Sequence, residues 1–288
     1  MKAPWRKRLA GLGLLVVVTV GAVWWINRSE PVPTGPPAGA PKAGDCWTVD
    51  PEAAKGRLPW PGTAQACTSA HTAEVYHVGQ VDHDLISRSR GKGDDAKVAL
   101  TLMFAQARRA CGAFASVYLG GDWHRDRVTL LANWIDPPTN GFFGCALAEV
   151  TGPGGAQYVT RATSLKGVGD SGPLATACVI RNGDTVRYAG CDEPHSGEFV
   201  GVYRITPDNA PFDAKALASA VDKGCEKAAL QYLGLPADGT RADLTIGYVG
   251  PSSAEAWLGS DQTFGCYASA GASLRGTVRN LGTRPLPT

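Results

Sequence analysis

Charged residues are few in this sequence, and those present form no basic stripe. Asp, Glu, Lys and Arg together make up 19% of its 288 residues. Five of the 28 basic residues lie within the first 28 positions, which leaves 23 basic residues against 26 acidic ones in the remainder. Because binding to nucleic-acid phosphates depends on clustered positive charge, this mildly acidic body argues against a nucleic-acid partner.

Two signatures of specific chemistry are also missing. No two cysteines have the Cys-x2-Cys spacing, so a thioredoxin-like redox function has no support. Lys92 lacks the Gly-x4-Gly-Lys-Ser/Thr arrangement of a phosphate-binding loop. The chain is instead rich in glycine and proline, with 36 and 20 residues, and 44% of it is hydrophobic. This composition excludes a disordered chain or a long helical bundle and predicts a turn-rich chain with a sizeable core.

The amino-terminal segment contains a long apolar run. Residues 9–26 are uncharged and approach the length of about 20 residues that a helix needs to cross a bilayer. Residues 1–8 are basic, which favours a cytoplasmic amino terminus. A cleaved signal peptide is the competing interpretation, but no Ala-x-Ala site follows Trp24 and Trp25. We expect a single-pass anchor, with residues 1–8 as a cytoplasmic tail and the rest of the chain outside the cell membrane.

A proline-rich linker follows the apolar run. Residues 27–43 are too rich in proline to pack into a core and predict a stiff stalk. All of the cysteines lie beyond this linker, on the side where an oxidising compartment lets disulfides form and persist. They are Cys46, Cys67, Cys111, Cys145, Cys178, Cys191, Cys225 and Cys266.

The remainder of the chain is an internal repeat. A Cys-x3-His-x2-Glu-apolar motif occurs at Cys67 and again at Cys191. A Cys-x6-Tyr-Leu-Gly segment follows in both halves, and Phe-Gly-Cys follows that. We expect the units to close with Ser164-Leu165-Lys166-Gly167 and with Ser273-Leu274-Arg275-Gly276. The repeat predicts two domains at residues 44–168 and 172–282, and an exposed, disordered tail at residues 283–288.

Helical and strand periodicities recur in the two halves. The third cysteine of each half lies in a helix that opens near Asp95 or Asp213 and ends at Gly120 or Gly234. The core candidates on these helices are Leu100, Phe104, Ala107, Phe114 and Tyr118 in the first, and Leu217, Val221, Ala228 and Tyr232 in the second. Strand signals flank each helix. We therefore predict an α+β fold: a single transmembrane helix followed by two tandem, homologous, disulfide-stapled α+β domains.

Each half holds four cysteines, which allow three pairings that sequence alone cannot distinguish. We favour joining the first cysteine to the second and the third to the fourth, so that one bond in each half staples helix to strand. The pairs would be Cys46 with Cys67, Cys111 with Cys145, Cys178 with Cys191, and Cys225 with Cys266.

The repeated His71/Glu74 and His195/Glu198 have two interpretations. As metal ligands they fall short, because each half offers only two donors once its cysteines are oxidised and zinc normally takes three or four. The alternative is that they fix a loop to the start of a strand through side-chain hydrogen bonds. Their repetition favours this architectural role, so we expect no bound metal, although a shared partner-binding surface would also fit.

A hydrolase is the alternative function. Gly169-Asp170-Ser171-Gly172-Pro173 resembles the nucleophile segment of chymotrypsin-like serine proteases, and the segment around His71 resembles their histidine segment. Such an enzyme also needs a carboxylate, for which Asp84, Asp122 or Asp126 would serve. The serine segment lacks a glycine of that family's pattern, and nothing like Ser171 follows His195, so we expect no enzyme.

Tryptophans offer a third interpretation. Trp123, Trp134 and Trp257 have the flat faces on which cell-wall sugars stack, although a buried tryptophan beside a disulfide is the commoner role. Glycan binding through Trp123 or Trp257 would make peptidoglycan a partner.

The Cys-x3-His-x2-Glu motif resembles that of the septum-formation family of actinobacterial membrane proteins, at Cys67, His71 and Glu74 and again in the second half. The second copy has Phe199 where the family has valine. The resemblance implies a role in division septum or envelope assembly and supplies no catalytic residues. We therefore expect a binding or scaffold protein of the cell envelope, without cofactor, anchored in the membrane and recruiting an envelope or division protein.

Overall fold

A computed structural model describes residues 33–288, apart from residues 154–156, 170, 171, 173, 177, 184, 208 and 209. Gly35–Thr288 form one compact unit, which includes both of the expected domains. The expected cytoplasmic tail and transmembrane helix lie outside the described residues. Among the residues that are described, no helix is both long and apolar enough to cross a bilayer.

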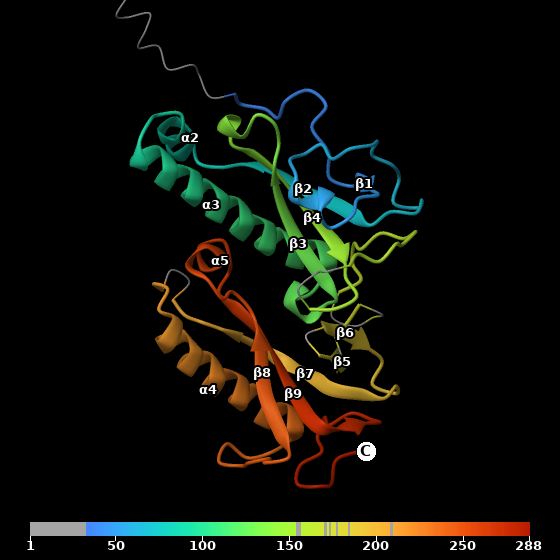
Figure 1. Ribbon diagram of the computed structural model, residues 1–288. Helices are drawn as coiled ribbons and strands as arrows, with labels where there is room; N and C mark the ends of the chain where they lie inside the picture. The colour runs from blue at the N-terminus through green and yellow to red at the C-terminus, as the bar shows by residue number, and fades with distance from the viewer. Residues whose placement is uncertain are drawn as a thin grey trace, which may run out of the picture. The chain divides into compact units, whose positions relative to one another are not determined.

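The first half is an antiparallel sheet with a long helix against it (Figure 1). Its strands lie in the order β1-β2-β4-β3. They are β1 (Cys46–Trp47), β2 (Ala73–Gln80), β3 (Val128–Trp134) and β4 (Phe142–Glu149). The helices are α2 (His83–Ser89) and α3 (Asp94–Leu119), with short 3-10 turns η1 (Ala53–Lys55), η2 (Trp123–Arg125) and η3 (Pro138–Asn140).

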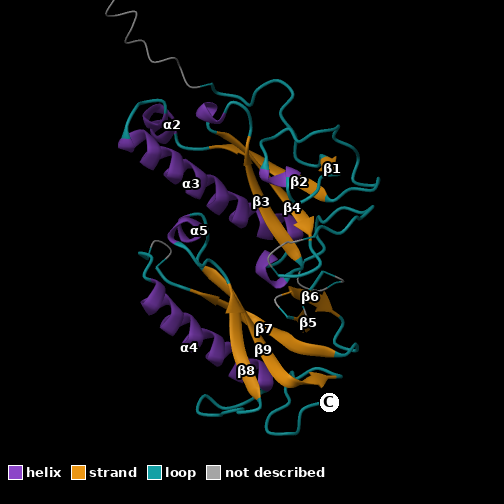
Figure 2. Ribbon diagram, in the orientation of Figure 1, coloured by secondary structure: helices purple, strands orange, loops and turns teal. Residues whose placement is uncertain are grey.

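The second half has the same plan, with one long helix against an antiparallel sheet (Figure 2). Its strand order is β6-β5-β7-β9-β8, so β5, β7, β9 and β8 correspond to β1, β2, β4 and β3, and β6 is added at the edge. The strands are β5 (Cys178–Asn182), β6 (Thr185–Ala189), β7 (His195–Arg204), β8 (Leu244–Val249) and β9 (Thr263–Leu274). The helices are α4 (Ala214–Leu233) and α5 (Ala254–Leu258).

Period-two alternation along β2 divides its side chains between two layers. Ala73 and Val75 join a core with Trp47 and Trp60, on the side that faces the loop after β1. Tyr76 faces the helix, where its hydroxyl donates to the Cys111 carbonyl at 2.7 Å. Each half thus has its own apolar core, and its helix side carries the polar groups described below.

The long helices begin and end for identifiable reasons. Asp213 caps α4, because its side chain accepts from the backbone N–H groups of Lys215 and Ala216. Helix α3 begins at Asp94, one residue before the expected start, and has no side-chain cap. Gly120 and Gly234 end the two helices with φ of 81° and 71°, the left-handed geometry that glycine adopts without strain.

The buried face of α3 differs from the expected one by about one residue. Leu100, Phe104 and Phe114 are 42%, 38% and 44% exposed, although we expected them in the core. Small residues face the sheet instead, because they let the helix backbone approach closely, and the disulfide at Cys111 fixes that orientation. The buried residues are Ala96, Ala99, Met103, Ala105, Ala107, Cys111, Gly112, Ala115 and Leu119.

The eight cysteines form four disulfides, in the pairing that the sequence analysis favoured. Cys46–Cys67 and Cys178–Cys191 tie β1 and β5 to the loops before β2 and β7. Cys111–Cys145 and Cys225–Cys266 join each long helix to a central strand. A disulfide of this kind typically stabilises a fold by about 2–4 kcal/mol, which matters for halves with small cores.

The carboxyl-terminal residues 283–288, which we expected to form an exposed, disordered tail, make contacts with the second half. The Arg275 N–H donates to the Pro287 carbonyl at 2.6 Å, and Leu286 packs against the core of the second half. The Arg241 guanidinium also binds the Arg284 carbonyl. The second half therefore extends to the last residues, because an apolar side chain and two backbone contacts hold the segment down.

Candidate functional site

A buried glutamate lies at the centre of the first half. Glu74 on β2 is 1% exposed and accepts a hydrogen bond from the Tyr118 hydroxyl on α3. Its carboxylate also accepts from Ser164 Oγ at 2.6 Å and from the Leu165 N–H at 2.7 Å. One carboxylate thus holds a strand, a helix and the closing segment together.

The second half repeats this arrangement around Glu198 on β7. The hydroxyls of Tyr232 and Thr277 donate to Glu198 Oε1, both at 2.5 Å. The Val278 N–H donates to Oε2 at 2.7 Å. Because buried carboxylates are costly unless fully hydrogen-bonded, this full set of donors supports an architectural role for the two glutamates.

The closing segments correspond in a different register from the expected one. We matched Ser164 with Ser273, but Thr277 makes the contact to the buried glutamate that Ser164 makes. Three residues further on, Gly167 and Asn280 have φ of 73° and 55°, and each N–H donates to the carbonyl of the helix tyrosine. Ser273 does not take the place of Ser164, because it still lies within β9, which ends at Leu274.

His71 and His195 occupy matching buried positions, with 0% and 2% exposure. Nδ1 of each lies close to a backbone carbonyl two residues earlier, Ser69 at 2.8 Å and Glu193 at 2.7 Å. Because a carbonyl only accepts, Nδ1 carries the proton. In the part of the chain that the structure describes, Nε2 of neither histidine has a hydrogen-bond partner. Each imidazole thus fixes a loop to the start of a strand.

Side chains that can ligate metals do gather around His71. Ligand atoms of Cys46, Cys67, His71 and Glu74 lie within 4.8 Å of one another. Both sulfurs are joined in a disulfide, however, and both oxygens of Glu74 accept hydrogen bonds. Cysteine binds zinc as a thiolate and not as a disulfide, so the oxidised cluster leaves only His71 as an available ligand, which is too few for a zinc site.

The hydrolase interpretation placed His71 with Ser171 and one of three acids. Ser171 lies outside the described residues, and His71 is closed to solvent, with Nδ1 on the Ser69 carbonyl. Asp84 is an exposed residue of α2 that lies 3.6 Å from Arg88, and Asp126 is 3% exposed. Asp122 belongs to a different cluster.

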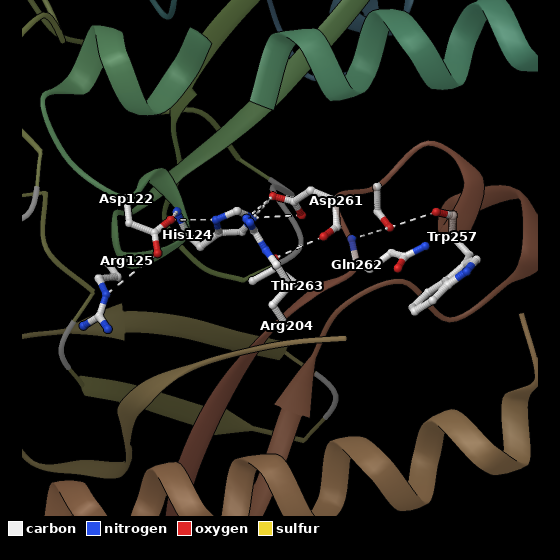
Figure 3. Close-up of polar contacts among 9 residues, drawn as sticks. Asp122, His124, Arg125, Arg204, Trp257, Asp261, Gln262 and Thr263 are labelled. Carbon is white, nitrogen blue, oxygen red and sulfur yellow. Dashed lines mark hydrogen bonds and ion pairs between the residues drawn. The ribbon is translucent and has the colours of Figure 1, made fainter. Parts of the chain in front are cut away.

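That cluster joins the two halves at His124 (Figure 3). His124 Nδ1 lies 2.7 Å from Asp122 Oδ1, within the first half. Nε2 lies 3.0 Å from Asp261 Oδ2, in the loop before β9 of the second half. Arg204 also donates to Asp261 Oδ2, at 3.1 Å. Because both ring nitrogens face carboxylates, the ring makes both hydrogen bonds only when it is protonated.

The pKa values of His124, Asp122 and Asp261 all depart from their ordinary values. Burial lowers the pKa of His124, but the hydrogen bonds and charges of Asp122 and Asp261 more than offset this, so that its pKa lies above the ordinary value. The His124 hydrogen bond lowers the pKa of Asp122. Burial raises the pKa of Asp261, and His124 and Arg204 reverse that effect and leave it lowered. With both nitrogens occupied, His124 is an electrostatic clamp between the halves and has no free lone pair for general base catalysis.

A cavity of about 590 Å³ lies beside this clamp, between the two halves. Side chains of α3, η2 and β3 line it from the first half, and side chains of β6, α5 and β9 from the second. Arg108, Trp123 and Tyr267 are among them, together with His124 and Asp261 of the clamp. Burial lowers the pKa of Arg108, partly offset by the charge of Asp261.

The structure separates the three tryptophans proposed for sugar stacking. Trp257 is 2% exposed in the core of the second half, where its Nε1 donates to the Ala210 carbonyl at 2.8 Å. Stacking on a sugar through Trp257 is therefore ruled out. Trp134 is half-buried on β3. Trp123 lines the cavity, and its ring centroid lies 3.9 Å from that of His124.

Sequence reasoning missed this cavity. It assigned no role to Arg108 or His124, and it named Asp122 only as one possible acid of the hydrolase interpretation. The available signal was the dense charge and aromatic pattern of Asp122-Trp123-His124-Arg125 after a helix end. No pattern pointed to Asp261, because its contact with His124 depends on how the two halves pack.

A family model described as septum formation matches residues 43–266, and the match runs across both halves. Neither a curated protein nor a solved structure matches the chain.

Proposed function

Because the chain belongs to the septum-formation family, we propose that it is a membrane-anchored, extracytoplasmic binding or scaffold protein that takes part in building the division septum. The family match over residues 43–266 carries this proposal. On this proposal the two halves are tandem copies of one domain, and residues 9–26 hold them at the outer face of the membrane.

The disulfides support the extracytoplasmic part of the proposal. Every cysteine is in a disulfide, and such bonds persist in oxidising compartments and not in the bacterial cytoplasm. The basic residues 1–8 before an apolar run support the same orientation. The scaffold role rests on the buried His and Glu of both halves, which hold the fold together and leave the surfaces available for a partner.

Live imaging through division tests the septal role. The full-length chain is fused at its carboxyl terminus to a fluorescent protein that matures outside the cytoplasm. We expect enrichment at septa as they form, and loss of the signal from septa when residues 43–266 are deleted but the anchor is kept. A uniform envelope signal through the whole cycle would overturn the septal role.

Protease access tests the anchor separately. In spheroplasts, protease added from outside should degrade a carboxyl-terminal epitope while an amino-terminal one stays protected. Release of the full-length chain into the medium, or protection of both epitopes, would refute the proposed topology whatever the imaging shows.

A further inference from the structure

The cavity between the halves has the size and walls of a small-molecule site. Its volume of about 590 Å³ lies within the range of roughly 300–1,000 Å³ that such sites occupy. Phe104, Trp123, Tyr188 and Tyr267 contribute aromatic surface to its lining. Flat aromatic faces of this kind suit a sugar ring or another ligand with an apolar face.

Arg108 provides a cationic group of this cavity, whose lining also includes the carboxylates of Asp126 and Asp261. Its side chain leaves α3 and packs against α5, where Arg108 Cδ lies 3.1 Å from the position that a Cβ on Gly259 would take. Within the described part of the chain, the Arg108 guanidinium makes no hydrogen bond and no ion pair. The acid whose charge acts on it, Asp261, is already bound by His124 and Arg204.

Two other enclosed arginines, Arg161 and Arg241, are paired with carboxylates. Arg161, with a side chain 13% exposed, lies 2.7 Å from Glu149, and Arg241, with a side chain 9% exposed, lies 2.7 Å from Asp243. A partly buried guanidinium with its donors unused, beside aromatic walls, matches the planar fork that binds a carboxylate.

We propose that this cavity binds a carboxylate-bearing glycopeptide unit of the cell wall, with the carboxylate on Arg108 and a sugar ring against Trp123. The choice of a cell-wall source rests on the proposed function, whereas the carboxylate and the ring follow from the cavity itself. Glu255, an exposed residue of α5 that also lines the cavity, repels any anionic group placed beside it, so that the ligand carboxylate is directed to Arg108 and away from α5.

Calorimetric titration of the full-length chain in detergent micelles tests this site. The probe is a disaccharide–tripeptide from muramidase-digested peptidoglycan. The comparison probes are the same compound with its carboxylates amidated, N,N′-diacetylchitobiose, which has the sugars without a carboxylate, and inorganic phosphate. We expect saturable binding of the first probe alone. No saturable binding of it, equal binding of its amidated form, or equal competition by phosphate would overturn the proposal.

Three variants assign the contact to Arg108. Arg108→Gln should weaken binding by roughly tenfold or more, because it removes a charge-assisted bidentate contact. Glu255→Gln should bind at least as tightly as the wild type. Arg109→Gln is the matched control, since it removes the same charge at the next position of α3 from a residue that does not line the cavity, and it should change affinity by less than about twofold. Equal losses at positions 108 and 109 would overturn the assignment.

Two further measurements distinguish failure of this site from misfolding and from failure of the proposed function. If Arg108→Gln lowers the unfolding temperature, Arg108→Lys is the second variant, because it keeps the positive charge but loses the planar guanidinium. We expect Arg108→Lys to be stable and to bind the glycopeptide more weakly than the wild type, and unchanged binding would overturn the bidentate contact. Imaging of the fusion that carries Arg108→Gln distinguishes loss of ligand binding from loss of septal localisation. Septal enrichment of the wild-type chain without glycopeptide binding would refute this site and leave the proposed function intact.

Discussion

The buried glutamates show how a single side chain organises each half. Replacement of Glu74 by glutamine puts an amide where a carboxylate oxygen accepted, so that one of the three donors from Tyr118, Ser164 and Leu165 meets another donor. We expect Glu74→Gln to lower the free energy of unfolding by about 2–4 kcal/mol, as losing a buried charged network does.

Urea unfolding followed by circular dichroism measures this loss. Glu52→Gln is the matched control, because Glu52 is exposed and its ion pair within the described part of the chain is with Lys55, which is also exposed. The control should leave the unfolding midpoint unchanged. Equal midpoints for the two variants would mean that the Glu74 network contributes nothing to stability.

The motif itself was visible in the sequence, and its donors were visible only in part. The spacing of Cys67, His71 and Glu74 predicted a loop fixed to a strand, and the repeated tyrosine on each helix was predicted only as a core residue. The hydroxyl partner from the closing segment could not be predicted by comparing the two halves, because Thr277 replaces Ser164 at a different distance from the preceding strand. The buried glutamate needs one hydroxyl and one backbone N–H from the closing segment, and two different local sequences supply them in the two halves.

At the scale of elements, substitutions on helix α3 show which of its faces contributes more to stability by packing. Met103 is 0% exposed, whereas Leu100 on the neighbouring face is 42% exposed. Met103→Ala leaves a cavity in the buried side of α3, and we expect a loss of about 2–5 kcal/mol in the free energy of unfolding. Leu100→Ala is the matched control on the same helix and should cost less than about 1 kcal/mol.

Urea titrations of both variants under identical conditions give the comparison. A larger loss for Leu100→Ala would restore the helix face that periodicity predicted. Periodicity placed the helix and its end at Gly120 correctly, but it ranked faces by the size of apolar side chains. Close packing of an alanine-rich face on the sheet reversed that ranking, and the disulfide from Cys111 to Cys145 fixes the buried side in the structure.

At the scale of the whole molecule, the two halves are joined by a clamp whose strength depends on protonation. His124 donates to Asp122 of its own half and to Asp261 of the other only as an imidazolium, because the neutral ring presents a lone pair to one carboxylate. Its pKa is raised in the folded chain, so the clamp's contribution is fully present below the unfolded histidine pKa of about 6.5 and is lost as pH rises through the folded value. The pKa values of the two aspartates are lowered, so acid weakens the clamp only as they protonate, well below that range.

A double-mutant cycle measures the clamp across the halves. For His124→Asn, Asp261→Asn and the double variant, we expect a coupling free energy of about 0.5–3 kcal/mol at pH 5.5 that shrinks as pH rises through the raised pKa of His124. The contact between Arg204 and Asp261 does not titrate in this pH range. Asp261→Asn alters it equally with His124 present and with His124 replaced, so it cancels from the coupling to first order. A coupling that stays constant from pH 5.5 to 9 would show that the ring does not bridge the carboxylates as an imidazolium.

The His124 ring also lines the cavity beside Arg108, so weakening of the clamp loosens the cavity walls that a ligand would contact. The affinity for the glycopeptide should therefore fall in the wild type over the same pH range in which the coupling shrinks. In His124→Asn the affinity should not change over that range.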